Sequence, residues 1–159
     1  IVRERFVRLI SAALRKTPHC CVEIAGAASF VKRLRALPNV VLGLATGGWG
    51  ETALAKLRHA GIDATGLAFA SADDAPARIE IMLKCREQIL ATAPAFTDPP
   101  VYVGDGVWDV AAARTLGWQF IGTGSGERAE QLRQRGAELV FPDYRDAQAI
   151  LAAVVEAKA

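Results

Sequence analysis

Residues 101–109 read VYVGDGVWD, an apolar strand followed by a glycine–aspartate–glycine turn and the start of a helix. Asp105 stands at the end of the predicted strand, and Asp109 follows it four residues later. One turn of helix separates the two, so both carboxylates can face the same point. Such a pair of carboxylates suits Mg²⁺, which takes one or two of them together with water and phosphate. The alternative is that Asp105 caps the helix and Asp109 is an exposed acid in its first turn.

A second apolar run ends in a similar way. Residues 40–45 read VVLGLA, and Thr46, Gly47 and Gly48 follow directly. A short run without polar residues is typical of a strand that is covered on both faces. A hydroxyl beside bare backbone N–H groups near a helix start makes a small anion site, and phosphate is the commonest biological anion that fits. The alternative is a tight turn in which Thr46 only caps the helix.

Apolar runs and helical patterns alternate along the rest of the chain. Strands are predicted at 40–45, 65–71, 101–103, 118–121 and 139–141. Helices are predicted at 2–15, 27–36, 50–60, from about 73–76 to 90, 107–116, 127–135 and from about 145. This alternation predicts an α/β fold, a doubly wound parallel sheet with helices on both faces. In such sheets ligands bind beyond the carboxyl ends of the strands, so the residues just after each strand are the candidates for function.

The helix after the second strand carries two candidate cations. Arg78 lies in its first turn, and Lys84 follows six residues later. Six residues rotate a helix by roughly 600°, so the two side chains face about 120° apart and only one can easily reach the strand ends. Arg78 is nearer the carboxyl edge, and surface charge is the alternative for each.

Composition excludes several classes of protein. The chain has 159 residues, of which 52% are hydrophobic and 23% charged, enough for one ordinary domain with a core and at most a small appendage. The net charge of +2 is too small for nucleic-acid binding by bulk electrostatics. No apolar run approaches the roughly 18–20 residues that span a bilayer, so we expect no membrane segment.

The N-terminus and the cysteines indicate where the protein works. The first ten residues include four charged side chains, so no signal peptide is expected. Cys20, Cys21 and Cys85 are odd in number and form no metal-binding spacing. A reduced, cytoplasmic chain is therefore predicted.

Taken in order, these features resemble the haloacid dehalogenase superfamily of phosphotransferases over about residues 25–142. VVLGLATGG is similar to the second motif of that superfamily, an apolar strand ending in Ser or Thr. VYVGDGVWD is similar to the fourth motif in its GDxxxD form. The resemblance implies a Rossmann-like sheet and Mg²⁺-dependent hydrolysis of a small phosphorylated metabolite through an aspartyl-phosphate. The low net charge and the short apolar runs predict no nucleic-acid or membrane partner.

The resemblance also assigns roles to the phosphate-binding residues. Thr46, with Gly47 and Gly48, would bind the phosphoryl oxygens through its hydroxyl and the backbone N–H groups. The third motif of the superfamily is a Lys or Arg near a helix start. Arg78 fits that place best, with Lys84 as the alternative, and it would neutralise charge on the phosphoryl group.

The two aspartates of the fourth motif would form the metal site. Asp105 would bind or orient Mg²⁺ and so belong to the catalytic residues, and Asp109 would support it from behind. This division suits phosphoryl transfer, which needs mainly positioning and charge neutralisation.

The sequence departs from the superfamily at the first motif, DxDx(T/V), which supplies the aspartate nucleophile and the general acid/base. Residues 1–45 contain no aspartate. We therefore expect residues 1–22 to be the end of a helical cap domain and residues 23–159 to be an α/β core without its first strand. On this expectation about 70 residues, including the nucleophile, lie upstream. The open alternatives are a non-catalytic fragment or binding module, and a phosphomutase or dehalogenase of the same superfamily.

Overall fold

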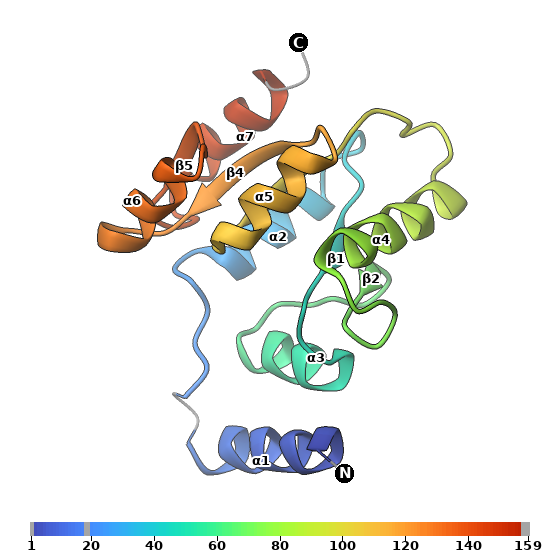
Figure 1. The fold of residues 1–159 in the computed structure, drawn as a ribbon, viewed down its shortest axis with the longest axis vertical. Coiled ribbons are helices and arrows are strands. Elements are labelled where there is room, and N and C mark those ends of the chain that lie inside the picture. Colours follow the sequence, from blue (N-terminus) through green and yellow to red (C-terminus); the bar gives the residue numbers. More distant parts are fainter. Residues whose placement is uncertain (1, 18–19, 157–159) are drawn as a thin grey trace. The chain divides into compact units, whose positions relative to one another are not determined.

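The computed structural model describes residues 2–17 and 20–156, and its described part contains seven helices and five strands (Figure 1). The strands are β1 (Gly43–Ala45), β2 (Ala68–Ala70), β3 (Val101–Gly104), β4 (Gln119–Thr123) and β5 (Leu139–Phe141). The helices are α1 (Val2–Lys16), α2 (Ala27–Arg35), α3 (Gly50–His59), α4 (Arg78–Thr92), α5 (Val107–Thr115), α6 (Gly126–Gln134) and α7 (Ala147–Glu156).

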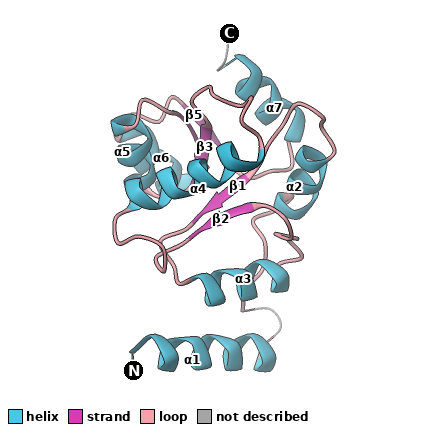
Figure 2. Cartoon of the chain, turned by 90° about the vertical axis from the view of Figure 1, so that its right-hand side faces the viewer, coloured by secondary structure: helices cyan, strands magenta, loops and turns pink. Residues whose placement is uncertain are grey.

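The predicted α/β class is confirmed, because strands and helices alternate and every described strand pair is parallel. The described strands form two sheets, one of β1 and β2 and one ordered β3-β4-β5. Figure 2 shows β1 and β2 side by side. Within these sheets β1 and β3 each pair with one neighbour only.

The chain divides into two compact units. The first unit comprises Ile1–Glu23 and Val31–Phe96, and the second comprises Ile24–Phe30 and Thr97–Ala159. The division expected from the sequence, a cap end at 1–22 and a core at 23–159, stays a prediction, because compactness does not identify a cap.

The first unit is built around α4 packed on the two-stranded sheet. Its core consists of Ala70, Ile81 and Cys85, which are all buried. Small residues bring the helix close to the sheet: a Cβ added at Gly43 would lie 2.5 Å from the Cys85 sulfur. Gly43 is therefore required by the packing of α4 on β1.

Several element boundaries in the first unit differ from the predicted ones; β2, for example, begins at Ala68 rather than at residue 65. β1 begins at Gly43 rather than at residue 40, because its pairing with the three-residue β2 starts at Gly43 and Ala68. α4 begins at Arg78 rather than near residues 73–76. Asp73 and Asp74 instead lie in the preceding loop, where Asp74 accepts hydrogen bonds from the N–H and hydroxyl of Ser71.

The second unit is a three-stranded sheet with α5 and α6 packed on it. Its core includes Val110, Leu132 and Ala137. The segment 24–30 joins this unit although it precedes β1 in the chain. No helix in the described part is long and apolar enough to cross a membrane.

Candidate functional site

The loop after β1 carries the predicted phosphate-binding residues. The N–H of Thr46 donates to the carbonyl of Ala70 at the end of β2, at 2.9 Å, which fixes the start of the loop at the carboxyl edge of the sheet. The Thr46 hydroxyl oxygen accepts from the N–H of Gly48 at 3.2 Å. This local bond turns the chain so that Gly47 and Gly48 are exposed.

The two glycines are not required by the fold of the loop. Neither has a positive φ. A Cβ at Gly47 would come no closer than 3.7 Å to another group, and one at Gly48 no closer than 3.6 Å, which are ordinary contacts. Side chains would therefore fit at both positions, and their absence leaves the loop backbone open. This is expected of a loop that a ligand approaches closely.

Of the two candidate cations, Arg78 lies at this loop. It is the first residue of α4, and its Nη1 lies 3.4 Å from the carbonyl oxygen of Ala45. Its guanidinium carbon would be 3.7 Å from a Cβ at Gly47. Lys84 is exposed and pairs instead with Glu87 on its own helix, at 2.9 Å, and this hydrogen bond raises the pKa of Lys84.

Asp73 and Trp49, which lie in segments next to this loop, are held by contacts with α3 and α1. Asp73 accepts from the N–H of Gly50, the first residue of α3, at 3.0 Å, and it also pairs with Arg3 of α1. A carboxylate at this end of α3 is favoured by the helix dipole. Trp49 is half-buried and packs edge-on against Phe6 of α1, with 5.1 Å between the ring centres.

Asp105 and Asp109 of the second unit have different surroundings. Asp105 follows β3, is exposed, and forms an ion pair with Arg128 of α6. Asp109 is only 4% exposed. Its Oδ2 accepts from the N–H of Gly106 at 3.1 Å, and its Oδ1 lies 3.5 Å from the Tyr102 hydroxyl oxygen. The reading of Asp109 as an exposed acid is therefore wrong: its carboxylate holds the Gly104–Asp105–Gly106 turn from inside.

Further polar groups lie at the same edge of the three-stranded sheet. Thr123 ends β4, is buried, and its hydroxyl oxygen lies 3.5 Å from the carbonyl oxygen of Gly104. The Tyr144 hydroxyl bonds to Thr123, and burial raises the pKa of Tyr144, with the negative charge of Asp105 acting in the same direction. Thr123, Tyr144 and Arg128 are not among the site residues predicted from the sequence.

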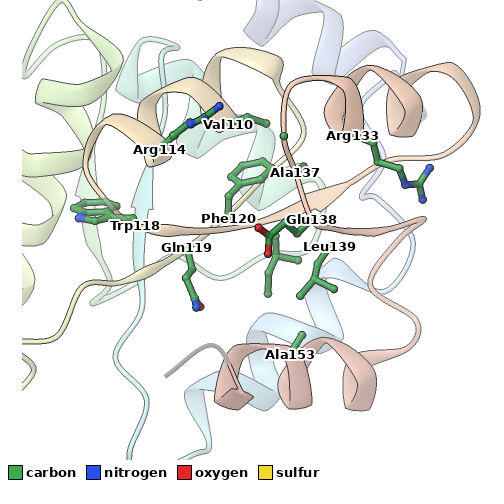
Figure 3. Close-up of a pocket in the computed structure, with 12 residues that line it drawn as sticks. Val110, Arg114, Trp118, Gln119, Phe120, Arg133, Ala137, Glu138, Leu139 and Ala153 are labelled. Atoms are coloured by element: carbon green, nitrogen blue, oxygen red, sulfur yellow. The ribbon is translucent and has the colours of Figure 1, made fainter. Parts of the chain in front are cut away.

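A pocket of about 850 Å³ in the second unit lies away from these residues. Its lining includes Gln119 and Leu139, the first residues of β4 and β5, so it opens at the amino edge of the sheet (Figure 3). None of the predicted site residues lines it. The candidate chemistry is at the opposite, carboxyl edge, as expected for an α/β sheet.

The donor set at Asp105 fits Mg²⁺ in part. In the described part of the chain no three His, Cys, Asp or Glu side chains gather as a metal site. Mg²⁺ needs fewer protein ligands than that, because it keeps several waters and is bound through one or two carboxylates. Asp105 supplies one exposed carboxylate, and Asp109 braces the turn that carries it.

Comparison with known proteins gives matches among solved structures only. No family model and no curated protein matches the sequence. A hydrolase from Pseudomonas syringae superposes with a TM-score of 0.70 at 23% identity, over 90% of this chain and 66% of that one. A conserved haloacid dehalogenase-like protein of unknown function from Agrobacterium tumefaciens superposes with a TM-score of 0.63 at 24% identity, over 83% of this chain and 61% of that one.

This chain thus spans less than two thirds of the length of each of the two structures. At these identities the similarity concerns the fold. Together with the two motifs at the strand ends, it shows that the chain has the fold of the haloacid dehalogenase-like proteins.

Proposed function

We propose that the complete protein containing this chain is a Mg²⁺-dependent hydrolase of small phosphomonoesters. The observation that carries the proposal is the position of the Arg78 guanidinium beside the exposed Thr46–Gly47–Gly48 loop. A fixed positive charge, a hydroxyl and the backbone N–H of Gly47 are the chemistry that a phosphoryl group requires. One of the two neighbouring structures is a hydrolase, which supports the reaction class.

In this proposal the first unit binds the phosphoryl oxygens. The Thr46 hydroxyl and the N–H of Gly47 donate to them, and Gly48 keeps the loop backbone open. Arg78 offsets the negative charge that surrounds the reacting phosphorus. These groups are set in place before the ligand arrives, because the loop is anchored to β2 by the Thr46 N–H and Arg78 is anchored by its helix.

The second unit supplies the metal site of the proposal. Asp105 holds the ion through one carboxylate, and Asp109 keeps the turn in shape by accepting from the N–H of Gly106. When bound, Mg²⁺ neutralises charge on the phosphoryl oxygens and orients them. The proposed setting is the cytoplasm, in keeping with the three free cysteines.

The nucleophile of the proposed reaction is an aspartate upstream of this sequence, since residues 1–45 contain none. In the superfamily it stands at the end of a first strand in the middle of the sheet. Among the described strands all but β4 have an unpaired side, which is compatible with such a strand. The absence of an aspartate from residues 1–45 also favours a second candidate, a module that binds an anion without turnover.

The release of inorganic phosphate distinguishes the hydrolase from the anion-binding module. It is measured for the complete protein on a panel of small phosphomonoesters, with and without Mg²⁺. We expect release that depends on Mg²⁺. With a haloacid as substrate instead, halide release insensitive to EDTA would indicate a dehalogenase. Phosphate moved within one phosphomonoester would indicate a mutase. Phosphate binding without any turnover would establish the non-catalytic module.

The roles of the two cations can be separated in the same assay. Arg78→Ala removes the charge beside the loop, and we expect kcat/KM to fall by about 100-fold or more, the usual cost of losing one preorganised donor. Lys84→Ala is the matched control, because Lys84 pairs with Glu87 on an exposed helix face, and its effect should stay within about twofold. Full activity of the Arg78→Ala enzyme would contradict the phosphate-binding role.

A further inference from the structure

Arg128 is placed where it does not help its own helix. It is the third residue of α6, in the first turn. A positive charge near a helix N-terminus is unfavourable, because the helix dipole already presents positive charge there. Glu127, in the same turn, has the sign that the helix prefers. The position of Arg128 is therefore explained by its partner, the carboxylate of Asp105.

The loop before α6 makes room for this arginine. A Cβ at Gly124 would lie 2.9 Å from the Cγ of Arg128 and 3.0 Å from its Cδ. Gly124 has no positive φ, so its backbone conformation does not require glycine. The absent side chain instead lets the stem of Arg128 lie against the loop and carry the guanidinium to Asp105.

The ion pair can be exchanged for another partner. The Asp105 side chain is 48% exposed and the Arg128 side chain 59% exposed. A pair this exposed is weak and screened by salt. A guanidinium and a divalent cation repel each other when both lie against the same carboxylate, because both are positively charged.

We propose that Arg128 is an internal counter-ion that holds Asp105 in the metal-free protein and competes with Mg²⁺ for it. Arg128 thereby sets the Mg²⁺ concentration at which the site fills. The inference rests on the proposed function in one respect, that Asp105 is the carboxylate that binds Mg²⁺.

The test is the apparent dissociation constant for Mg²⁺, measured on the complete protein by titration calorimetry in low salt. Arg128→Gln removes the competing charge, and we expect the dissociation constant to fall by about two- to fivefold, as the loss of an exposed ion pair allows. Arg128→Lys keeps the charge and should bind Mg²⁺ much as the native protein does. Raising the salt concentration should narrow the difference between the native protein and Arg128→Gln.

Arg133→Gln is the matched control, because Arg133 lies in the last turn of the same helix and lines the pocket at the amino edge of the sheet. It should leave the dissociation constant unchanged. Gly124→Ala offers an independent route, since its methyl group displaces the arginine stem and should shift Mg²⁺ affinity in the same direction as Arg128→Gln. Circular dichroism checks that each variant is folded.

An unchanged or weaker Mg²⁺ affinity of Arg128→Gln, with Mg²⁺ still bound by the native protein, would overturn the role of Arg128 and leave the proposed function standing. Absence of Mg²⁺ binding by both proteins would overturn the metal site itself and, with it, the competition. Tighter binding by Arg128→Gln but not by Arg133→Gln is the result that the proposal requires.

Discussion

Asp105 and Asp109 illustrate how much the surroundings of a residue decide its use. They stand four residues apart on one motif, and both are carboxylates. Asp109 is buried and bonded to the backbone of its own turn, whereas Asp105 is exposed and pairs with a side chain from another element. The first stabilises the turn, and the second is available for exchange of partners.

Loss of the buried carboxylate should be costly. Asp109→Ala leaves the buried N–H of Gly106 without its acceptor, and we expect the free energy of unfolding to fall by about 1–3 kcal/mol. Urea denaturation gives this value from the shift in the midpoint. Asp105→Ala is the matched control, because its side chain is exposed, and the change should be within about 0.5 kcal/mol. Equal midpoints for Asp109→Ala and the native protein would contradict the bracing role.

At this scale the sequence predicted the residues at strand ends but not their partners. Local patterns predict the strands and helices, and the candidate residues follow from the ends of those elements: Thr46, Arg78 and Asp105. The pairing of Asp105 with Arg128 depends on how β3 and β4 are aligned, Gly104 beside Gly122, and no local pattern contains that register. Likewise, the bond from Gly50 to Asp73 joins the start of α3 to a loop 23 residues later in the chain.

Among the elements, α4 and β1 form a closely fitted contact in the first unit. Cys85 of α4 packs onto Gly43 of β1, where no side chain would fit. The sequence predicted both elements from their apolar patterns. It did not predict their exact ends, because the length of β1 is set by its pairing with β2 and the start of α4 by the Ser71–Asp74 hydrogen bonds.

Because Cys85 is buried in the contact between α4 and β1, we expect its thiol to be unreactive. Burial raises the pKa of Cys85 from 9.0 to about 11. At pH 8 only about 0.1% of the thiol is then the reactive thiolate. We expect a thiol reagent such as dithiobisnitrobenzoate to modify the exposed Cys20 readily and Cys85 only after unfolding, with modified sites mapped by mass spectrometry.

The same shift in pKa has a consequence for stability. The folded state favours the neutral thiol, so the contribution of Cys85 to the free energy of unfolding is present below pH 9 and is lost as the pH rises through about 11.

Modification of Cys85 in the folded protein at the rate of Cys20 would contradict the packing of α4 on β1.

At the scale of the whole molecule, the feature least visible in the sequence is the membership of residues 24–30 in the second unit. The N–H of Tyr144 donates to the carbonyl of Ala25 at 2.9 Å, and Phe30 stacks on Tyr144 with 5.4 Å between ring centres. Gly26 makes this possible: its φ is +83°, and a Cβ there would lie 2.8 Å from the backbone of Tyr144. These contacts join segments more than 100 residues apart, which local patterns do not specify.

The order of strands and helices, in contrast, was predictable because parallel α/β folds repeat a simple local alternation. The two neighbouring structures support the same fold at 23% and 24% identity. Fold similarity alone does not assign a reaction, so the proposed activity depends on Arg78, Thr46 and Asp105 and on the residues that hold them.

The most direct test of the proposed activity is the rate of phosphate release from small phosphomonoesters by the complete protein and by its Asp105→Asn variant. Asparagine preserves the shape of the side chain but removes the charge that is proposed to bind Mg²⁺. We predict that the native protein requires Mg²⁺ and that Asp105→Asn lowers kcat/KM by about 100-fold or more. Full Mg²⁺-dependent turnover by Asp105→Asn would contradict the proposed mechanism.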